Sequence, residues 1–451
     1  MRTTMDVQHF IDALPFSRLQ RGILWLCFLV VAVDGFDTAA IGFIAPAIRE
    51  EWQLGASALA PLFGAGLFGL MAGALLFGPL ADRFGRKTIL VGSVTFFGLA
   101  SLASAAAPDL TWLIVLRFIT GLGLGGAMPN AITLTSEYCP ATRRASLVTL
   151  MFCGFTIGSA LGGLLSAQIL SSFGWRGVLF IGGVLPLLLV PVLLRSLPES
   201  LRFLVLKRRP QAVIDAVLAR LAPRQLPYPQ LTAPAAAAQA PVRELFRPAL
   251  AFGTVLLWIT FFMSLLIIYL ISSWLPTLLH NTGASLSRAS WITATFQIGG
   301  TIGAILLGRW MDRFGASRTL SITYGIGALF VSLCGISSGQ PWLLVLAVFG
   351  VGFCVSGSQV GANALAAAFY PTSNRATGVS YANAVGRCGS VLGSLSGGWL
   401  MAMQLDMGVI LSLLAIPALL AAAAISQIGR VQHHAARHDS KPAPCSDSAM
   451  P

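Results

Sequence analysis

Five ionisable residues interrupt long apolar stretches of this sequence: Asp34, Asp37, Arg117, Glu137 and Arg387. A charge at the centre of a membrane helix costs at least about 2.5–3.5 kcal/mol, so each of them is a candidate functional group. Asp34 and Asp37 stand three residues apart, which puts them about 60° apart on one helical face. Arg117 lies at a similar depth, and an Asp–Arg pair in a low dielectric tunes a carboxylate to gain and lose a proton. We predict proton coupling by this group, with a static ion pair between two helices as the alternative.

The two halves of the chain differ at these acidic positions. Ser264 and Ile267 occupy the matching places in the second half. A purely structural device would be repeated in both halves, so the acids look specialised. Glu137 lies near the end of its span, just before Pro140, where it would serve as a proton exit or gate partner. A plain carboxylate at a helix end is the alternative reading.

Arg387 stands near the middle of its span, and the spans of the second half contain no acidic residue to pair with it. A guanidinium binds a carboxylate with two parallel hydrogen bonds, so we predict that Arg387 anchors an anionic substrate. Cation–π or carbonyl packing is the alternative. Aromatic and amide side chains at a similar depth would suit a ring-bearing acid, although for each one packing or lipid contact is the alternative. The predicted further substrate contacts are Trp258, Gln297, Tyr381 and Asn383. The other residues at about this depth are Phe261, Phe262, Tyr269, Phe296 and Asn363.

The composition indicates a membrane protein. Of the 451 residues, 56% are hydrophobic and 10% are charged, against roughly 25% charged in soluble domains. Stretches of about 20 apolar residues recur, each long enough to cross the hydrocarbon core as a helix. Basic loops on one side of the membrane explain the net charge of +13 better than nucleic-acid binding does. Without a Walker A sequence, ATP-driven transport is not expected, and the cysteines show neither paired nor metal-ligand spacing, so we expect no disulfide. We expect no metal, with the tail histidines His433, His434 and His438 as the alternative, and neither a cofactor nor enzymatic activity.

An all-α polytopic fold with twelve membrane helices in two six-helix bundles follows from the apolar pattern. The spans are predicted near residues 22–48, 56–80, 88–107, 111–137, 145–171, 175–197, 248–275, 288–309, 318–337, 341–369, 378–403 and 407–428. The expected units are an N-terminal segment 1–21, a bundle 22–197, a linker 198–247, a bundle 248–428 and a disordered tail 429–451. Most of the 29 Lys and Arg residues fall in the termini and the loops on their side. The positive-inside rule then places both termini in the cytoplasm.

The two bundles carry related loop sequences. Residues 78–85 (Gly-Pro-Leu-Ala-Asp-Arg-Phe-Gly) recur as residues 308–315 (Gly-Arg-Trp-Met-Asp-Arg-Phe-Gly). Repeats of six spans in the same direction are typical of one large transporter fold, in which the substrate site lies between the halves. We interpret the charges in these loops as an electrostatic latch between helices, with loop cations that only fix topology as the alternative. The predicted latch residues are Asp82, Arg83, Arg86, Asp312 and Arg313.

The stretch 78–87 resembles the loop signature of the major facilitator superfamily, and other motifs narrow the resemblance. Residues 34–46 (Asp-Gly-Phe-Asp-Thr-Ala-Ala-Ile-Gly-Phe-Ile-Ala-Pro) resemble the first-span signature of its aromatic acid:proton symporters. Residues 117–125 (Arg-Phe-Ile-Thr-Gly-Leu-Gly-Leu-Gly) and 273–277 (Ser-Trp-Leu-Pro-Thr) continue the likeness, which runs from about residue 6 to residue 430. It is strongest to bacterial 4-hydroxybenzoate and protocatechuate permeases.

The resemblance implies a bacterial inner-membrane protein that imports a small aromatic carboxylate, of the 4-hydroxybenzoate, protocatechuate or benzoate type, together with a proton. It also implies that the acids of the first span, the charges of the fourth and the arginine of the eleventh are functional. Two departures bear on the substrate. The loop after Asp312 lacks a histidine, and Tyr381 and Ala384 replace an expected Trp and Gly.

Other functions fit the same charges. In a proton-antiporting exporter of drugs or metabolites, the two aspartates would exchange protons outward. A sensor of aromatic acids would bind its ligand with little flux, and a symporter of sugars or dicarboxylates is a further alternative. The direction of the protonophore-sensitive process and competition by unlabelled benzoates separate these cases.

Overall fold

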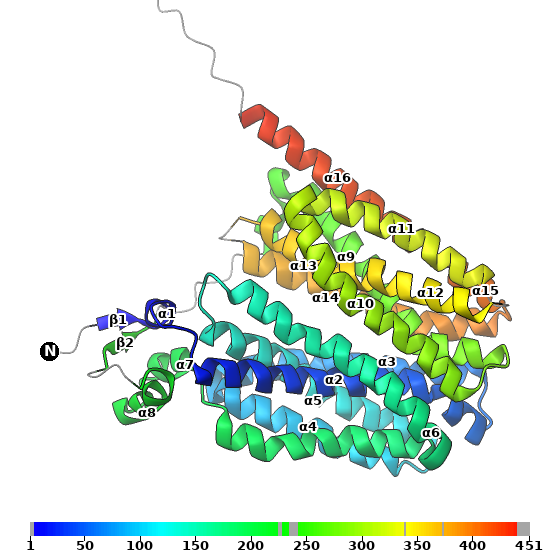
Figure 1. Cartoon of the computed structure of the whole chain (residues 1–451), viewed down its shortest axis with the longest axis horizontal. Coiled ribbons are helices and arrows are strands. Elements are labelled where there is room, and N and C mark those ends of the chain that lie inside the picture. The colour runs from blue at the N-terminus through cyan, green and yellow to red at the C-terminus, as the bar shows by residue number, and fades with distance from the viewer. Residues whose placement is uncertain (1–3, 224–227, 234–241, 338–339, 372–373, 440–451) are drawn as a thin grey trace, which may run out of the picture.

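Two helical bundles lie side by side in the computed structural model, with the N-terminal bundle below and the C-terminal bundle above in Figure 1. The structure describes residues 4–223, 228–233, 242–337, 340–371 and 374–439. Large apolar side chains such as Leu75, Phe173 and Leu329 are exposed on the outside. A protein surrounded by lipid exposes apolar side chains in this way.

The first bundle contains five long helices that make six spans. They are α2 (Arg18–Glu51), α3 (Ala60–Phe84), α4 (Arg86–Ala105), α5 (Leu110–Tyr138) and α6 (Arg144–Ser196), with a short 3₁₀ turn η1 (Ala56–Leu59) before α3. Gly174 interrupts α6 with φ 63° and ψ −170°. A residue without Cβ adopts this backbone readily, so the chain turns there between two spans, at the boundary that the sequence predicts.

The second bundle has the same order of spans, two of which are interrupted. Its elements are α9 (Pro248–Asn281), α10 (Leu286–Phe314), α11 (Ala316–Ile336), α12 (Pro341–Val351), the π-helical turn η3 (Gly352–Ser356), α13 (Gly357–Phe369), α14 (Arg375–Ala402), α15 (Met407–Leu413) and α16 (Ala415–Asp439). Together α12, η3 and α13 make one span, and α15 with α16 make another.

Twelve spans result, as expected, although length and hydropathy alone single out ten helices of the described chain. One of these ten is the whole of α6, which contains two spans, and α14 is absent from them. The reason for the second difference is composition, because α14 carries Asn383, Arg387 and several serines.

The repeated loop adopts the same conformation in both bundles. Gly85 separates α3 from α4 with φ 106°, and Gly315 separates α10 from α11 with φ 87°. Both glycines therefore occupy the region that other residues avoid. The sequence repeat thus corresponds to a structural repeat.

The segment between the bundles contains several short elements. It contains α7 (Leu201–Leu206), α8 (Gln211–Leu221), β2 (Gln230–Thr232) and η2 (Val242–Phe246). The N-terminal segment forms β1 (Thr4–Asp6) and α1 (Val7–Asp12), and β1 pairs in parallel with β2, with Met5 opposite Leu231. At the other terminus α16 extends to Asp439, beyond the predicted span end at 428, and residues 440–451 of the predicted tail lie outside the described residues.

The two bundles are joined at the end opposite α7 and α8. There Arg49 Nη1 donates to Asn281 Oδ1 at 2.8 Å, and His280 Nε2 lies 2.7 Å from Glu50 Oε1. A Cβ at Gly42 of α2 would collide with the backbone of α9, so glycine allows these helices to cross closely. These contacts close this end of the space between the bundles.

Candidate functional site

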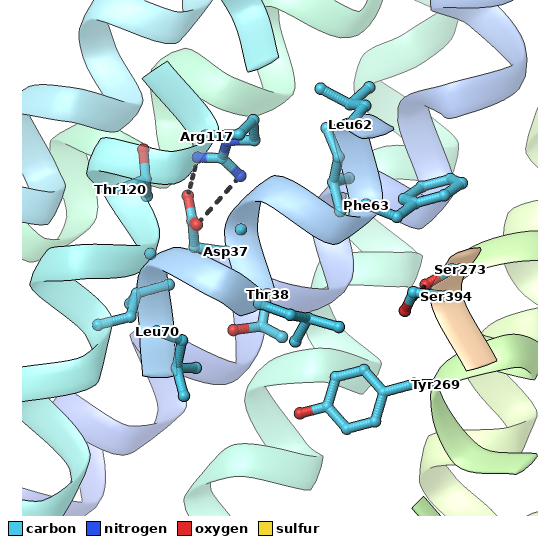
Figure 2. Close-up of a pocket in the computed structure, with 15 residues that line it drawn as sticks. Asp37, Thr38, Leu62, Phe63, Leu70, Arg117, Thr120, Tyr269, Ser273 and Ser394 are labelled. Carbon is cyan, nitrogen blue, oxygen red and sulfur yellow. Dashed lines mark hydrogen bonds and ion pairs between the residues drawn. The ribbon is translucent and has the colours of Figure 1, made fainter. Parts of the chain in front are cut away.

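Asp37 and Arg117 form a buried ion pair between α2 and α5, as Figure 2 shows. Arg117 Nη2 lies 3.2 Å from Asp37 Oδ1, and Nη1 lies 3.2 Å from Oδ2. Ser101 of α4 donates a further hydrogen bond to Oδ1 at 2.8 Å. The side chains are 1% and 4% exposed, so this carboxylate has its charge compensated and one oxygen bonded twice. Such an arrangement holds three helices together.

Asp34 has a different environment from Asp37, although both are buried on α2. Its Oδ1 accepts a hydrogen bond from Thr38 Oγ1 at 3.2 Å, and its Oδ2, like that of Asp37, is buried without a hydrogen-bond partner among the described residues. No described cation lies within ion-pair distance of it. An ionised Asp34 would be a buried charge with an unmet acceptor, so this group is suited to carry a proton.

A cavity of about 130 Å³ lies between the bundles in the middle of the molecule. The N-terminal bundle supplies mostly apolar and hydroxyl side chains, among them Thr38, Met128, Phe152, Phe155 and Thr156. The C-terminal bundle supplies the polar side chains Tyr269, Ser272, Gln297, Gln359, Asn363, Asn383 and Arg387. The cavity therefore has one aromatic wall and one wall with amides and a cation, which together suit a ring-bearing anion.

Arg387 provides the positive charge of the cavity. Its Nη1 donates to Tyr269 Oη at 3.0 Å, and it makes no ion pair with any acidic residue that the structure describes. Tyr269 also lines a smaller cavity of about 50 Å³ that contains the Asp37–Arg117 pair, and Figure 2 shows its ring opposite that pair. The tyrosine thus stands between the candidate substrate site and the buried pair.

The structure brings only part of the predicted substrate set to the cavity. Gln297 lines it and donates weakly to Ser272 Oγ at 3.4 Å, and Asn383 lines it as well. Tyr381 is 41% exposed, and Trp258 packs edge-on against the ring of Phe246 at 5.5 Å. Neither aromatic residue is among those that line the cavity in the part of the chain described.

Several lining residues were not identified from the sequence. Phe152 and Phe155 stack at 6.1 Å on the wall formed by α6, and Gln359 lies on α13 one turn before Asn363. The spacing of Gln359 and Asn363 by four residues was the available signal, because two amides on one face of an apolar span are costly unless they face a cavity.

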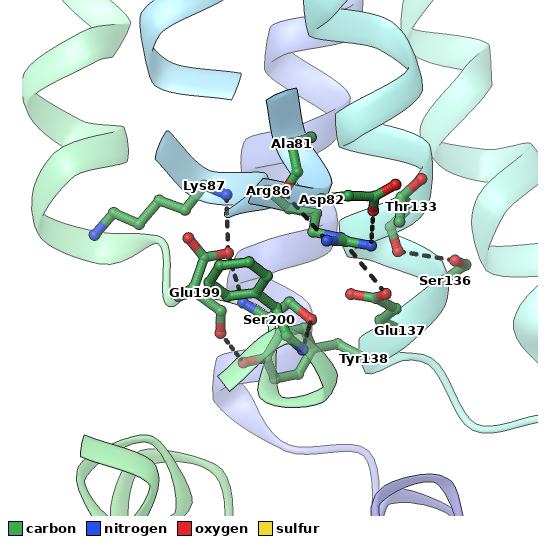
Figure 3. Close-up of polar contacts among 11 residues, drawn as sticks. Ala81, Asp82, Arg86, Lys87, Thr133, Ser136, Glu137, Tyr138, Glu199 and Ser200 are labelled. Carbon is green, nitrogen blue, oxygen red and sulfur yellow. Dashed lines mark hydrogen bonds and ion pairs between the residues drawn. The ribbon is translucent and has the colours of Figure 1, made fainter. Parts of the chain in front are cut away.

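The predicted latch residues assemble in the first bundle. Arg86 lies 2.7 Å from Asp82 and 3.8 Å from Glu137, and Figure 3 shows the three side chains together. Asp82 is 73% exposed, whereas Arg86 and Glu137 are largely buried. The neighbouring Glu199 accepts from the backbone N–H of Lys87 at 3.1 Å, which ties the segment before α7 to the start of α4.

The second bundle lacks this cluster. Asp312 and Arg313 are exposed, and Arg313 lies over the ring of Phe314 at 5.3 Å. Asp312 forms no ion pair within the described part of the chain. The reason is local, because Ala316 stands where the first bundle has Arg86. Arg83 is the equivalent of Arg313 in the first bundle, and it likewise lies over the ring of the following residue, Phe84.

Two six-span bundles that enclose a cavity with buried charges define a polytopic membrane transporter. Comparison with known proteins gives the family. The model of the Major Facilitator Superfamily matches residues 27–282 and 257–445, and the chain belongs to that superfamily.

Curated relatives cover nearly the whole chain. The 4-hydroxybenzoate transporter PcaK of Pseudomonas aeruginosa is 46% identical over 95% of this chain and 97% of its own length. A gallate transporter of Pseudomonas putida is also 46% identical, over 95% of this chain and 96% of its own length. The resemblance to aromatic acid transporters and the expectation that the chain is not an enzyme are confirmed by these relatives.

Solved structures show the same fold at low sequence identity. The xylose transporter XylE from E. coli, in a partially occluded inward-open conformation, superposes with a TM-score of 0.70. Its sequence is 19% identical, and the match covers 90% of this chain and 97% of that one.

Proposed function

We propose that this protein is a proton-coupled symporter that imports small aromatic carboxylates across the bacterial inner membrane, with both termini in the cytoplasm. The observation that carries the proposal is Arg387, a cation without an acidic partner among the described residues on the wall of a cavity between the bundles. The names of the relatives, transporters of 4-hydroxybenzoate and gallate, support an aromatic acid as the cargo.

The substrate carboxylate would bind Arg387, whose guanidinium already donates to Tyr269. A carboxylate is the acceptor that fits this fork, because it takes two parallel hydrogen bonds. The ring would lie against Phe152 and Phe155 on the opposite wall. Apolar contact on one side and a fixed charge on the other select for a flat acid.

Asp34 would carry the coupled proton, and Asp37 would stay ionised. The two acids differ in their partners, because Asp37 has Arg117 and Ser101 while Asp34 has only the hydroxyl of Thr38 as a bonded partner in the described chain. Arg387 places a positive charge on the cavity wall of the opposite bundle, and Asp34 is bonded to Thr38, which lines the same cavity. A bound substrate carboxylate would neutralise that charge, so Asp34 would then take up a proton. Substrate and proton therefore favour each other's binding.

The conformation described here would be one closed to the periplasm, since its closed end lies opposite the termini. In the cycle, protonated and loaded carrier closes at that end and opens to the cytoplasm. Substrate and proton leave, and the cluster of Arg86, Asp82 and Glu137 rearranges as the empty carrier returns. Transport by rocking of the two halves is the general behaviour of such folds.

Uptake by purified protein in liposomes tests the proposal. Labelled 4-hydroxybenzoate should accumulate when the outside is made acidic, and a protonophore should abolish the accumulation. Asp34→Asn, which mimics the protonated acid, should lose gradient-driven accumulation but retain exchange of internal for external substrate. Asp109→Asn is the matched control, because Asp109 caps α5 at an exposed loop and Asn caps equally well.

Two results would contradict parts of this scheme. Full gradient-driven accumulation by Asp34→Asn would exclude Asp34 as the proton carrier. Protonophore-sensitive exclusion of the aromatic acid, in place of accumulation, would instead favour an exporter.

A further inference from the structure

One residue of the cavity wall has a side-chain acceptor without a hydrogen-bond partner in the described part of the protein. Gln359 of α13 lines the cavity and is only 8% exposed. Its side-chain Oε1 is buried and has no hydrogen-bond partner among the described residues. Buried polar groups are nearly always bonded, so an unmet acceptor beside a binding cavity calls for an explanation.

The neighbouring amides are already committed to each other. Asn363 Nδ2 donates to the backbone carbonyl of Gln359 at 3.1 Å, and Asn383 Nδ2 donates to Asn363 Oδ1 at 3.1 Å. Asn383 Nδ2 also lies 3.0 Å from the carbonyl of Val379. These bonds fix the amide wall and leave the Oε1 of Gln359 as its unmet acceptor.

The Asn363–Asn383 contact also places Gln359 relative to Arg387. α13 ends at Phe369 and α14 begins shortly afterwards at Arg375, and the two helices run in opposite directions. Gln359 precedes Asn363 by one turn, and Arg387 follows Asn383 by one turn, so both lie about 6 Å from the contact in the same direction. The acceptor and the cation therefore stand at one depth on adjacent helices, whose axes are typically about 8–10 Å apart.

A π-helical turn precedes this wall. The turn η3 ends at Ser356, directly before α13, and Ser356, Gln359 and Asn363 all line the cavity. A π turn shifts the register of the residues that follow, and such turns occur frequently at functional sites. From the end of the turn onwards, Ser356, Gln359 and Asn363 share one face because they are three and four residues apart.

We infer that Gln359 recognises a ring hydroxyl of the substrate, with its Oε1 accepting the hydrogen bond while Arg387 holds the carboxylate. This inference rests on the proposed function and adds the specificity of the site. Both residues line the cavity, Gln359 from α13 and Arg387 from α14. A site built to bond a hydroxyl discriminates against the analogue that lacks it, because its own polar group is then left unpaired.

The test compares 4-hydroxybenzoate with benzoate in the same liposomes. Gln359→Leu keeps the size of the side chain but removes the acceptor. We expect its half-saturating concentration for 4-hydroxybenzoate to rise about ten- to a hundredfold, whereas that for benzoate holds or falls. Unimpaired benzoate uptake also shows that the variant is folded. Gln168→Leu is the matched control, since Gln168 is exposed on α6 and does not line the cavity, and it should leave both constants unchanged.

The outcomes separate this inference from the proposed function. If Gln359→Leu weakens both acids equally, or neither, Gln359 does not recognise the hydroxyl, and the transport proposal stands. If the wild-type protein accumulates neither acid, the proposed function fails and this inference fails with it. A selective loss for 4-hydroxybenzoate in Gln359→Leu alone supports the inference.

Discussion

Removing the charge of Asp37 should destabilise the protein far more than removing that of Asp34. Asp37→Asn leaves Arg117 as a cation that is only 4% exposed, after the loss of two contacts of 3.2 Å. Asp34→Asn is the matched change on the same helix, because Asp34 is equally buried but has no cation within ion-pair distance among the described residues. The same chemical substitution thus tests two environments.

The magnitude follows from the burial of the pair. Breaking a buried ion pair on one side typically costs about 3–5 kcal/mol, because the remaining charge is uncompensated. The total stability of a folded domain is about 5–15 kcal/mol, so the loss should be plain in thermal unfolding. For Asp34→Asn we expect a change of less than about 1 kcal/mol, since an amide oxygen still accepts from Thr38.

A thiol-reactive fluorescent dye provides the assay. The described cysteines are free, and most are buried, so the dye reports unfolding as they become accessible. Serine in place of the exposed Cys388 and of Cys445 in the tail removes the background. The midpoint of unfolding in detergent is then compared among the wild type and the two variants.

A second substitution makes the reasoning refutable. Arg117→Gln in the Asp37→Asn background removes the uncompensated cation, so the double variant should be more stable than Asp37→Asn alone. If Asp37→Asn unfolds at the wild-type temperature, the ion pair does not contribute to the free energy of unfolding, and the reasoning is refuted. Asp37 would then be a candidate proton carrier. If the double variant is less stable than the single, burial of the cation is not the cause.

Two further predictions concern the packing and closure of the bundles. Gly158→Ala should destabilise the protein by about 1–3 kcal/mol, because a Cβ would collide with the backbone of Ala32. Gly325→Ala, at a site with open space, should leave the unfolding midpoint unchanged in the same dye assay. Equal midpoints for the two variants would contradict this prediction. Glu50→Gln weakens the contact with His280 across the closed end, but Glu50 is 59% exposed, so the pair contributes at most about 1 kcal/mol. Spin-label distances between α2 and α9 should show at most about a fivefold increase in the open population, and complete opening would show that this pair alone holds the end closed.

The buried charges were predictable from the sequence, but their separate roles were not. Hydropathy exposes each charge in an apolar span, and depth along the helix matches Asp37 with Arg117. The same argument cannot separate Asp34 from Asp37, because both lie on one helical face. The separation comes from Ser101 and Arg117, which reach one acid and not the other, and these contacts depend on how α2 packs against α4 and α5.

The substrate wall shows a similar limit. Depth placed Trp258 and Tyr381 near Arg387, yet neither lines the cavity in the described structure. Depth does not fix the direction in which a side chain points, because that depends on the rotation of each helix within its bundle. Gln359 was not identified either, although it stands four residues before Asn363 on the same face of α13.

The helix with the predicted substrate anchor is also one that hydropathy does not identify as a span. Polar residues on α14 line the cavity and lower the mean hydropathy of the helix. Its place in the membrane depends instead on close packing, because Cβ atoms at Gly389 and Gly393 would meet the backbone carbonyls of Phe262 and Leu266 in α9. Small residues four apart let two helices approach closely, and the dispersion attraction between the closely packed backbones compensates for the polar face. The glycine seam of α14 and its polar cavity face are therefore complementary features, and a bulky residue in the seam would displace Arg387 from the cavity.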